Sequence, residues 1–90
     1  MTPKQERSIK QRVGRAIAKF RRDNGGKVSC RVYADGDSAI VMTSAADGDN
    51  VNWARKPMDS YIGPALAEIC KPLPNGCHCC GNVSREFVLK

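Results

Sequence analysis

The chain begins with a strong amphipathic helical pattern, and this pattern limits the folds that are open to it. Thr2, Pro3 and Gln5 give the start signal: a threonine cap, a proline at the first helical position and the glutamine of a capping box. Apolar residues then recur at helical spacing within about 100° of arc. They are Ile9, Val13, Ala16, Ile17 and Phe20. We predict a helix over residues 3–23, ended by the Asn-Gly-Gly run at 24–26, whose apolar stripe the rest of the chain must cover.

The next part of the chain alternates as strands do. One face of residues 27–34 carries Val28, Cys30 and Val32, and the other face carries polar residues and a tyrosine. The Asp-Gly pair at 35–36 predicts a hairpin turn into a second run over 38–43. A shorter alternating run over 51–54 suggests a third strand. Together these runs predict an antiparallel β-meander over residues 27–55.

Helical spacing returns in a short second helix, which we predict over residues 60–70 with Asp59 or Ser60 as its cap. The proline-rich segment after it predicts a Cys-rich turn over 71–84, with an optional last strand over 85–89. Ninety residues can bury one small core, so we expect a single domain over 1–90. The predicted class is α+β, in the order α-β-β-(β)-α-β, with an antiparallel sheet packed by a long N-terminal helix and a short second helix.

Positive charge is concentrated in the N-terminal helix. The first 31 residues hold ten of the 15 Lys and Arg residues and two of the nine acidic ones, a net charge of about +8 within an overall +6. Cations lie on both flanks of the apolar stripe, which indicates a polyanionic partner whose phosphates they would neutralise. The residues that we predict to bind nucleic acid are Lys10, Arg12, Arg15, Lys19, Arg21, Arg22, Lys27 and Arg31.

The basic helix could also have either of two different roles. Its charges could serve solubility alone, although solvated faces usually intersperse both signs. A helix lying on a membrane surface has a similar pattern, but this stripe lacks Trp and Leu and is needed for the core. We find no helix-turn-helix spacing, RNA-recognition sheet motif or leucine-zipper heptad, so we expect contact with the phosphate backbone rather than reading of the base sequence.

The cysteines suggest a metal site. Cys77 and Cys80 have the spacing of a zinc knuckle. Zinc needs four ligands, so two more must converge, and Cys70 and His78 are the predicted ones, with Cys79 and Cys30 as alternatives. In the alternative, the segment is a metal-free loop and Cys70 is a small buried hydrophobe. A redox pair is a third option. Five cysteines without an export signal suggest reduced thiols and a cytoplasmic location.

Catalysis is not expected. The single histidine lies inside the cysteine cluster, and the two Asp-Gly-Asp runs are what hairpin turns require. We therefore predict a protein that is not an enzyme and has no small-molecule substrate. No apolar run approaches the roughly 20 residues that span a bilayer, so we expect no membrane partner.

In size, charge and lack of catalytic motifs, the chain resembles small phage accessory proteins of the anti-CRISPR inhibitor kind. That resemblance implies an inhibitor that occludes a bacterial RNA-guided nucleoprotein complex, in the cytoplasm of the host cell. The basic helix would contact nucleic acid of the complex, while the sheet and the acidic turns would contact its protein subunits. The alternatives are a stand-alone, zinc-stabilised DNA- or RNA-binding regulator and a protein-binding adaptor whose helix meets an acidic groove.

Overall fold

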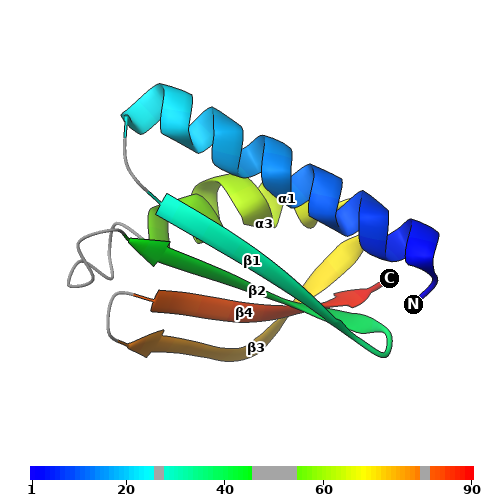
Figure 1. Ribbon diagram of the computed structural model, residues 1–90. Helices are drawn as coiled ribbons and strands as arrows, with labels where there is room; N and C mark the ends of the chain where they lie inside the picture. Colours follow the sequence, from blue (N-terminus) through cyan, green and yellow to red (C-terminus); the bar gives the residue numbers. More distant parts are fainter. Residues whose placement is uncertain (26–27, 46–54, 80–81) are drawn as a thin grey trace.

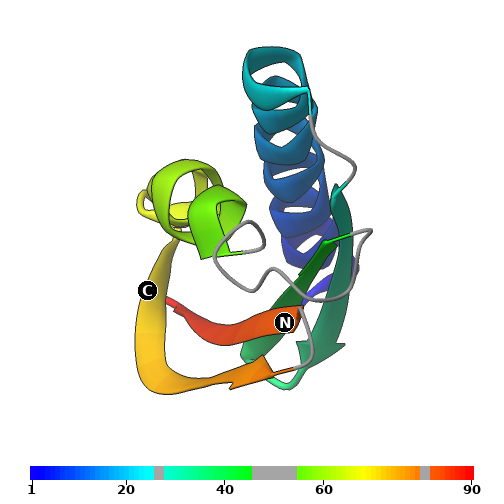
Figure 2. The same ribbon diagram turned by 90° about the vertical axis from the view of Figure 1, so that its left-hand side faces the viewer.

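The computed structural model describes residues 1–25, 28–45, 55–79 and 82–90. Two helical segments pack on one face of a four-stranded antiparallel sheet (Figures 1 and 2). This arrangement confirms the predicted α+β class, with the chain order α-β-β-α-β-β. The elements are α1 (Pro3–Asn24), β1 (Val28–Asp35), β2 (Ser38–Ala45), η1 (Met58–Ile62), α3 (Gly63–Leu66), β3 (Cys70–Cys79) and β4 (Asn82–Leu89).

The predicted N-terminal helix is confirmed together with its end signals. The backbone N–H of Gln5 donates to the Thr2 hydroxyl at 3.1 Å, and the Thr2 N–H donates to the Gln5 side chain at 2.8 Å, which completes the capping box. At the other end Gly25 takes a left-handed conformation with φ of 67°. Every residue of the predicted apolar stripe is buried.

The sheet has the strand order β1-β2-β4-β3, so β1 and β3 form its edges. The predicted hairpin is confirmed, with Asp35 paired to Ser38 across a short loop in which Gly36 has φ of 62°. The sheet face toward the helices carries buried residues on the inner strands, among them Val41, Val83 and Phe87. The apolar stripe of α1 packs on this face and closes the core.

The second helix begins and ends earlier than predicted. The chain is already helical at Arg55, and α3 ends at Leu66 rather than at residue 70. Asp59, a predicted cap, lies inside the helix and forms an ion pair with Arg85 of β4 at 3.1 Å. The π-helical turn of η1 precedes Pro64, which has no N–H to give to the preceding turn, and the wider turn makes room for its ring.

The predicted Cys-rich turn over 71–84 is wrong, because most of that segment forms β3 and the start of β4. The prolines at 72 and 74 are tolerated because β3 is an edge strand that bonds to β4 on one side only. The register shifts between Pro72 and Gly76, as a β-bulge requires. The optional last strand is present and begins at Asn82, while the predicted strand over 51–54 lies outside the described residues.

The capping box gives a direct test of what stabilises α1. Replacing Thr2 by Ala leaves the N–H of Gln5 without its acceptor, and we expect the free energy of unfolding to fall by about 1 kcal/mol. Urea denaturation followed by circular dichroism measures this change. Lys4→Ala, at an exposed position in the same turn, is the matched control and should change stability much less. Equal losses in the two variants would contradict the role of the cap.

Candidate nucleic-acid interface

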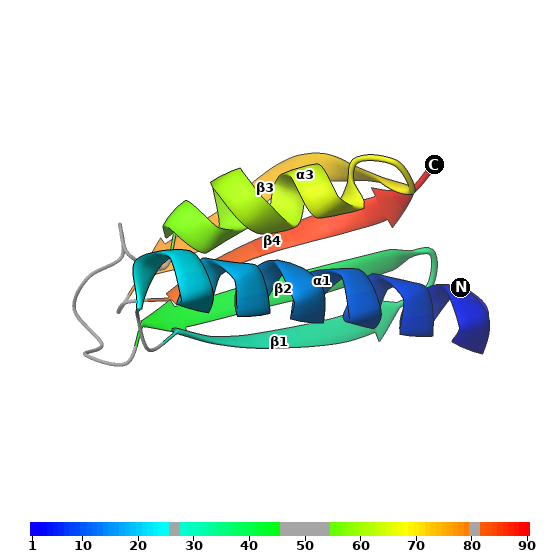
Figure 3. The same ribbon diagram turned by 90° about the horizontal axis from the view of Figure 1, so that it is seen from above.

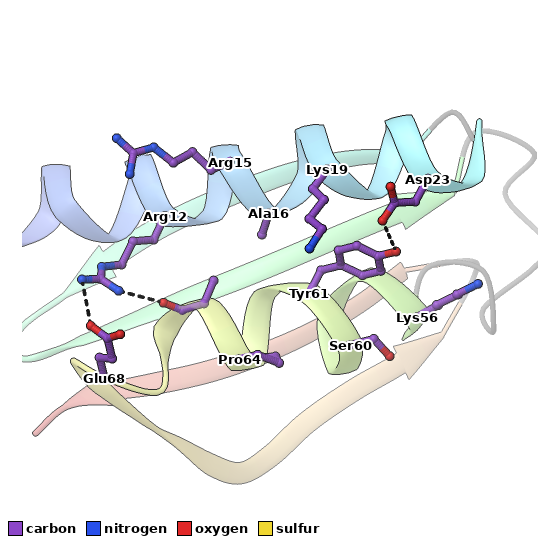
Figure 4. Close-up of a pocket in the computed structure, with 11 residues that line it drawn as sticks. Arg12, Arg15, Ala16, Lys19, Asp23, Lys56, Ser60, Tyr61, Pro64 and Glu68 are labelled. Carbon is purple, nitrogen blue, oxygen red and sulfur yellow. Dashed lines mark hydrogen bonds and ion pairs between the residues drawn. The ribbon is translucent and has the colours of Figure 1, made fainter.

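A groove of about 680 Å³ runs between α1 and the second helix (Figure 4). Its floor at mid-length is Ala16, a residue of the apolar stripe whose small side chain keeps the groove open. Pro64 and Ala65 of the second helix add further apolar lining, and the other lining side chains are polar or charged. The lining cations are Arg12, Arg15, Lys19 and Lys56, and the lining carboxylates are Asp23 and Glu68.

Arg12 closes one end of the groove. Its guanidinium donates to the carbonyl oxygen of Ala65 at 3.1 Å and forms an ion pair with Glu68 at 3.5 Å. These contacts connect α1 to the end of the second helix. Arg12 is therefore half-buried and partly neutralised, and it acts first as a clamp between the helices.

Arg15 and Lys19 are different, because both side chains are exposed and neither has an ion-pair partner within the described part of the chain. Lys19 extends into the groove toward Tyr61, while Arg15 points outward at its rim (Figure 4). Two adjacent turns of α1 thus present uncompensated positive charge, Lys19 inside the groove and Arg15 at its rim. A ligand with negative groups at this spacing would meet both of them.

Tyr61 organises the other end of the groove. Its hydroxyl donates to Asp23 at 3.0 Å and accepts from the Asn24 amide at 3.2 Å. Its ring packs edge-on against Phe20, with centroids 5.3 Å apart. The Lys56 ammonium donates to the Asn24 side-chain carbonyl oxygen at 2.8 Å, which places a further cation at this end. The Asp23 carboxylate is therefore bonded to the Tyr61 hydroxyl rather than to a lysine ammonium group.

The remaining predicted contact residues lie elsewhere. Arg21 donates from two nitrogens to the Val28 carbonyl oxygen, at 3.1 and 2.6 Å, so it holds β1 to α1. Lys10 lies on the opposite flank of α1, where its ammonium is 4.0 Å from Glu6. Arg31 lies on β1, on the sheet face that carries no helix.

Arg22 is exposed in the last turn of α1, and Lys27 lies outside the described residues. The structure therefore gathers three of the eight predicted residues, Arg12, Arg15 and Lys19, in one groove. Sequence analysis missed Lys56 and Tyr61. No motif around either residue indicates a binding role, because only the packing of the second helix against α1 brings them to the groove.

The proposed zinc ligands do not all come together. Cys70 is 1% exposed and pairs with Leu89, whereas Cys77 pairs with Ser84. Those partners are five positions apart on β4 (89 − 84), which separates the two cysteines by roughly 17 Å. Zinc–sulfur bonds are about 2.3 Å long, so the two cannot share one ion.

His78 pairs with Val83, beside Cys77, and Cys80 lies outside the described residues. Among the residues that the structure describes, no group of three His, Cys, Asp or Glu side chains is arranged to hold a metal. A zinc site at the Cys77 end of β3 stays a prediction.

The two cysteines whose side chains are described are protected thiols. Burial raises the pKa of Cys30 from its ordinary value of 9.0 to about 11, although the positive charge of Arg21 opposes the shift. Burial also raises the pKa of Cys70, against the opposing charges of Arg12 and Lys90. Both side chains therefore stay protonated near neutral pH and do not have the low pKa of redox-active cysteines.

We predict that Cys30 reacts with iodoacetamide in the folded protein with a pH midpoint near 11, compared with about 9 in urea. Because the folded state holds this proton more tightly, the associated stability is present below pH 9 and is lost as the pH rises toward 11. Peptide mapping by mass spectrometry follows Cys30 alone, and the urea-unfolded chain is the control. A folded-state midpoint equal to that in urea would contradict the burial.

Comparisons with protein-family models, with curated proteins and with solved structures found no match to this chain. No helix in the described part of the chain is long and apolar enough to cross a membrane.

Proposed function

We propose that this protein is a non-catalytic binder of nucleic-acid backbone and that the groove side of α1 is its contact surface. The observation that carries the proposal is the pair Arg15 and Lys19, exposed on adjacent turns and without an ion-pair partner in the described chain. Arg12 and Lys56 extend the positive surface toward the two ends of the groove. Surface cations that serve only solubility usually alternate with acidic residues, and here the acids are confined to the groove ends.

The spacing of these cations suits a repeating polyanion. Arg12, Arg15, Lys19 and Arg22 follow one another at intervals of three and four residues, which keeps them on one flank of α1. At 1.5 Å per residue they span roughly 15 Å of the helix axis. Phosphates of one strand recur about every 3.4 Å along a duplex axis, so several of them can approach this flank. Each phosphate neutralised releases counterions, which makes such binding strongly dependent on salt.

The groove offers recognition rather than chemistry. Its two carboxylates, Asp23 and Glu68, lie at opposite ends and are bonded to Tyr61 and to Arg12 respectively (Figure 4). Acid–base catalysis by a carboxylate pair needs both groups on the same reacting bond, and this separation does not provide it. We assign the groove no reaction.

The most specific form of the proposal is an inhibitor of a bacterial RNA-guided nucleoprotein complex, as the resemblance to anti-CRISPR proteins suggests. In that form the α1 groove lies against nucleic acid of the complex and other surfaces contact its protein subunits. The alternative is a regulator that binds bare DNA or RNA by itself.

The backbone proposal predicts a loss of affinity in the double variant Arg15→Gln, Lys19→Gln. Fluorescence anisotropy with labelled DNA and RNA duplexes of about 20 base pairs should show binding roughly tenfold weaker at about 0.1 M salt. The slope of log K against log salt should shrink in magnitude by about 2, because two phosphate contacts are lost. Lys71→Gln, Lys90→Gln makes the same charge change on exposed residues away from the groove and is the matched control. Equal losses in both double variants would mean that net charge alone is responsible.

A pull-down of the tagged protein from bacterial lysate, with and without nuclease, tests the inhibitor form. We expect one multi-subunit complex to remain bound after nuclease treatment, and the Arg15→Gln, Lys19→Gln variant to recover less of it. If nuclease removes every partner, the protein is a stand-alone nucleic-acid binder and the inhibitor proposal fails.

A further inference from the structure

The two edges of the sheet are protected to different degrees. The β3 edge contains Pro72 and Pro74 and a register shift, features that prevent a further strand from pairing. The β1 edge is regular: its eight residues pair with β2 without a shift, and it contains neither proline nor bulge. Seen from above, β1 runs along the margin of the sheet beside α1 rather than beneath it (Figure 3). A strand of this kind is a template for pairing with another strand.

The backbone groups that face outward from β1 can be identified. The hairpin closes with Asp35 opposite Ser38 across a two-residue loop, and the closing pair of such a hairpin is hydrogen-bonded. Bonding then alternates along the strand, so the odd-numbered residues of β1 bond to β2. Val28 fits this pattern: its carbonyl oxygen faces away from β2 and accepts hydrogen bonds from the Arg21 side chain. The N–H and C=O groups of Cys30, Val32 and Ala34 therefore point away from β2.

Above this edge, α1 leaves space. A groove of about 320 Å³ between α1 and β1 is lined by the cations Lys10 and Arg21 and by Val13, Gly14, Ile17, Cys30 and Val32. A Cβ added to Gly14 would meet no heavy atom within 4 Å, so no close contact within the described chain requires the glycine. A glycine inside a helix costs roughly 1 kcal/mol relative to alanine. The missing side chain keeps the groove open at the level of Val32.

We infer that a second copy of this chain pairs with the β1 edge, antiparallel and about a two-fold axis at Val32. An antiparallel partner must place matching faces together, which restricts the register to steps of two residues. With the axis at Val32, Val32 faces its own copy and Cys30 faces Ala34 of the partner subunit, so the apolar inner face continues across the interface. Both of these pairs join outward-facing backbone groups, as hydrogen bonding requires.

The outer face is also complementary in this register. Arg31 lies opposite Tyr33 of the partner subunit in a non-hydrogen-bonded pair, where side chains approach most closely. Tyr33 is 47% exposed and is the only exposed large hydrophobic residue in the described chain. A guanidinium over this ring makes a cation–π contact, and the two-fold axis repeats it. Moving the axis to residue 31 would instead place two Arg31 side chains opposite each other, which is unfavourable.

Such a dimer leaves the nucleic-acid groove free. The groove lies on the flank of α1 that faces the second helix, whereas the β1 edge lies beside the other flank. A two-fold axis perpendicular to the sheet puts the helices of both copies on the same side of one continuous sheet. The inference does not rest on the proposed function, and it can be tested without nucleic acid.

Sedimentation velocity from about 10 μM to 1 mM protein is the test, because dimer formation depends on concentration. We expect a dimer for the natural sequence and for Ala67→Gln, which adds the same long side chain at an exposed position just after the second helix as a control. Val32→Pro removes an outward N–H while leaving the β1–β2 ladder intact, and it should be monomeric. Gly14→Gln should also be monomeric, with a raised melting temperature that shows its fold is intact.

The inference is overturned if the natural sequence remains monomeric at about 1 mM. It is equally overturned if a dimer forms and Gly14→Gln does not weaken it, since the copies then associate through another surface. Hydrogen exchange provides a second measurement: the amide of Val32 should become protected as the protein concentration rises, while exchange at the β3 edge stays unchanged.

Discussion

The apolar stripe of α1 is buried against the sheet, and this contact fixes how the helix is oriented in the fold. Ile9 and Phe20 have no exposed surface, and each such side chain stabilises the fold by roughly 1.5–3 kcal/mol. Because this stripe must face the sheet, the cations of α1 are forced onto its two flanks. One flank then borders the second helix and the other borders β1, so the packing of the core determines which charges meet which neighbours.

Residues of the same type therefore have different roles along one helix. Arg12 and Arg21 bond to backbone carbonyl groups of the second helix and of β1, and both connect α1 to its neighbours. Arg15 and Lys19 lie between them in the sequence but project from the groove side without such contacts. A count of positive residues treats these positions alike. The structure separates cations that hold the fold together from those available to a ligand, and the proposed function rests on the second group.

The proposed nucleic-acid groove and the proposed dimer edge lie on opposite flanks of α1, and neither obstructs the other. A two-fold dimer would bring two positive grooves to the same side of the sheet. Two linked sites raise the effective concentration of the second contact once the first has formed, so a long polyanion would gain affinity without any new residue. The uncovered sheet face, which carries Arg31 and Tyr33, would then form one surface through both copies.

The sequence alone determined α1, the first hairpin and the α+β class, because those signals are local: a capping box, an apolar stripe and a Gly turn each act within a few residues. Other features arise only when helices pack and strands pair. The segment after Cys70 contains turn-forming residues, yet it forms a strand because β4 pairs with it along one side. Lys56 and Tyr61 reach the groove, and Cys70 is separated from Cys77, only through packing and strand register. The order of residues records neither the packing of the second helix on α1 nor the register between β3 and β4.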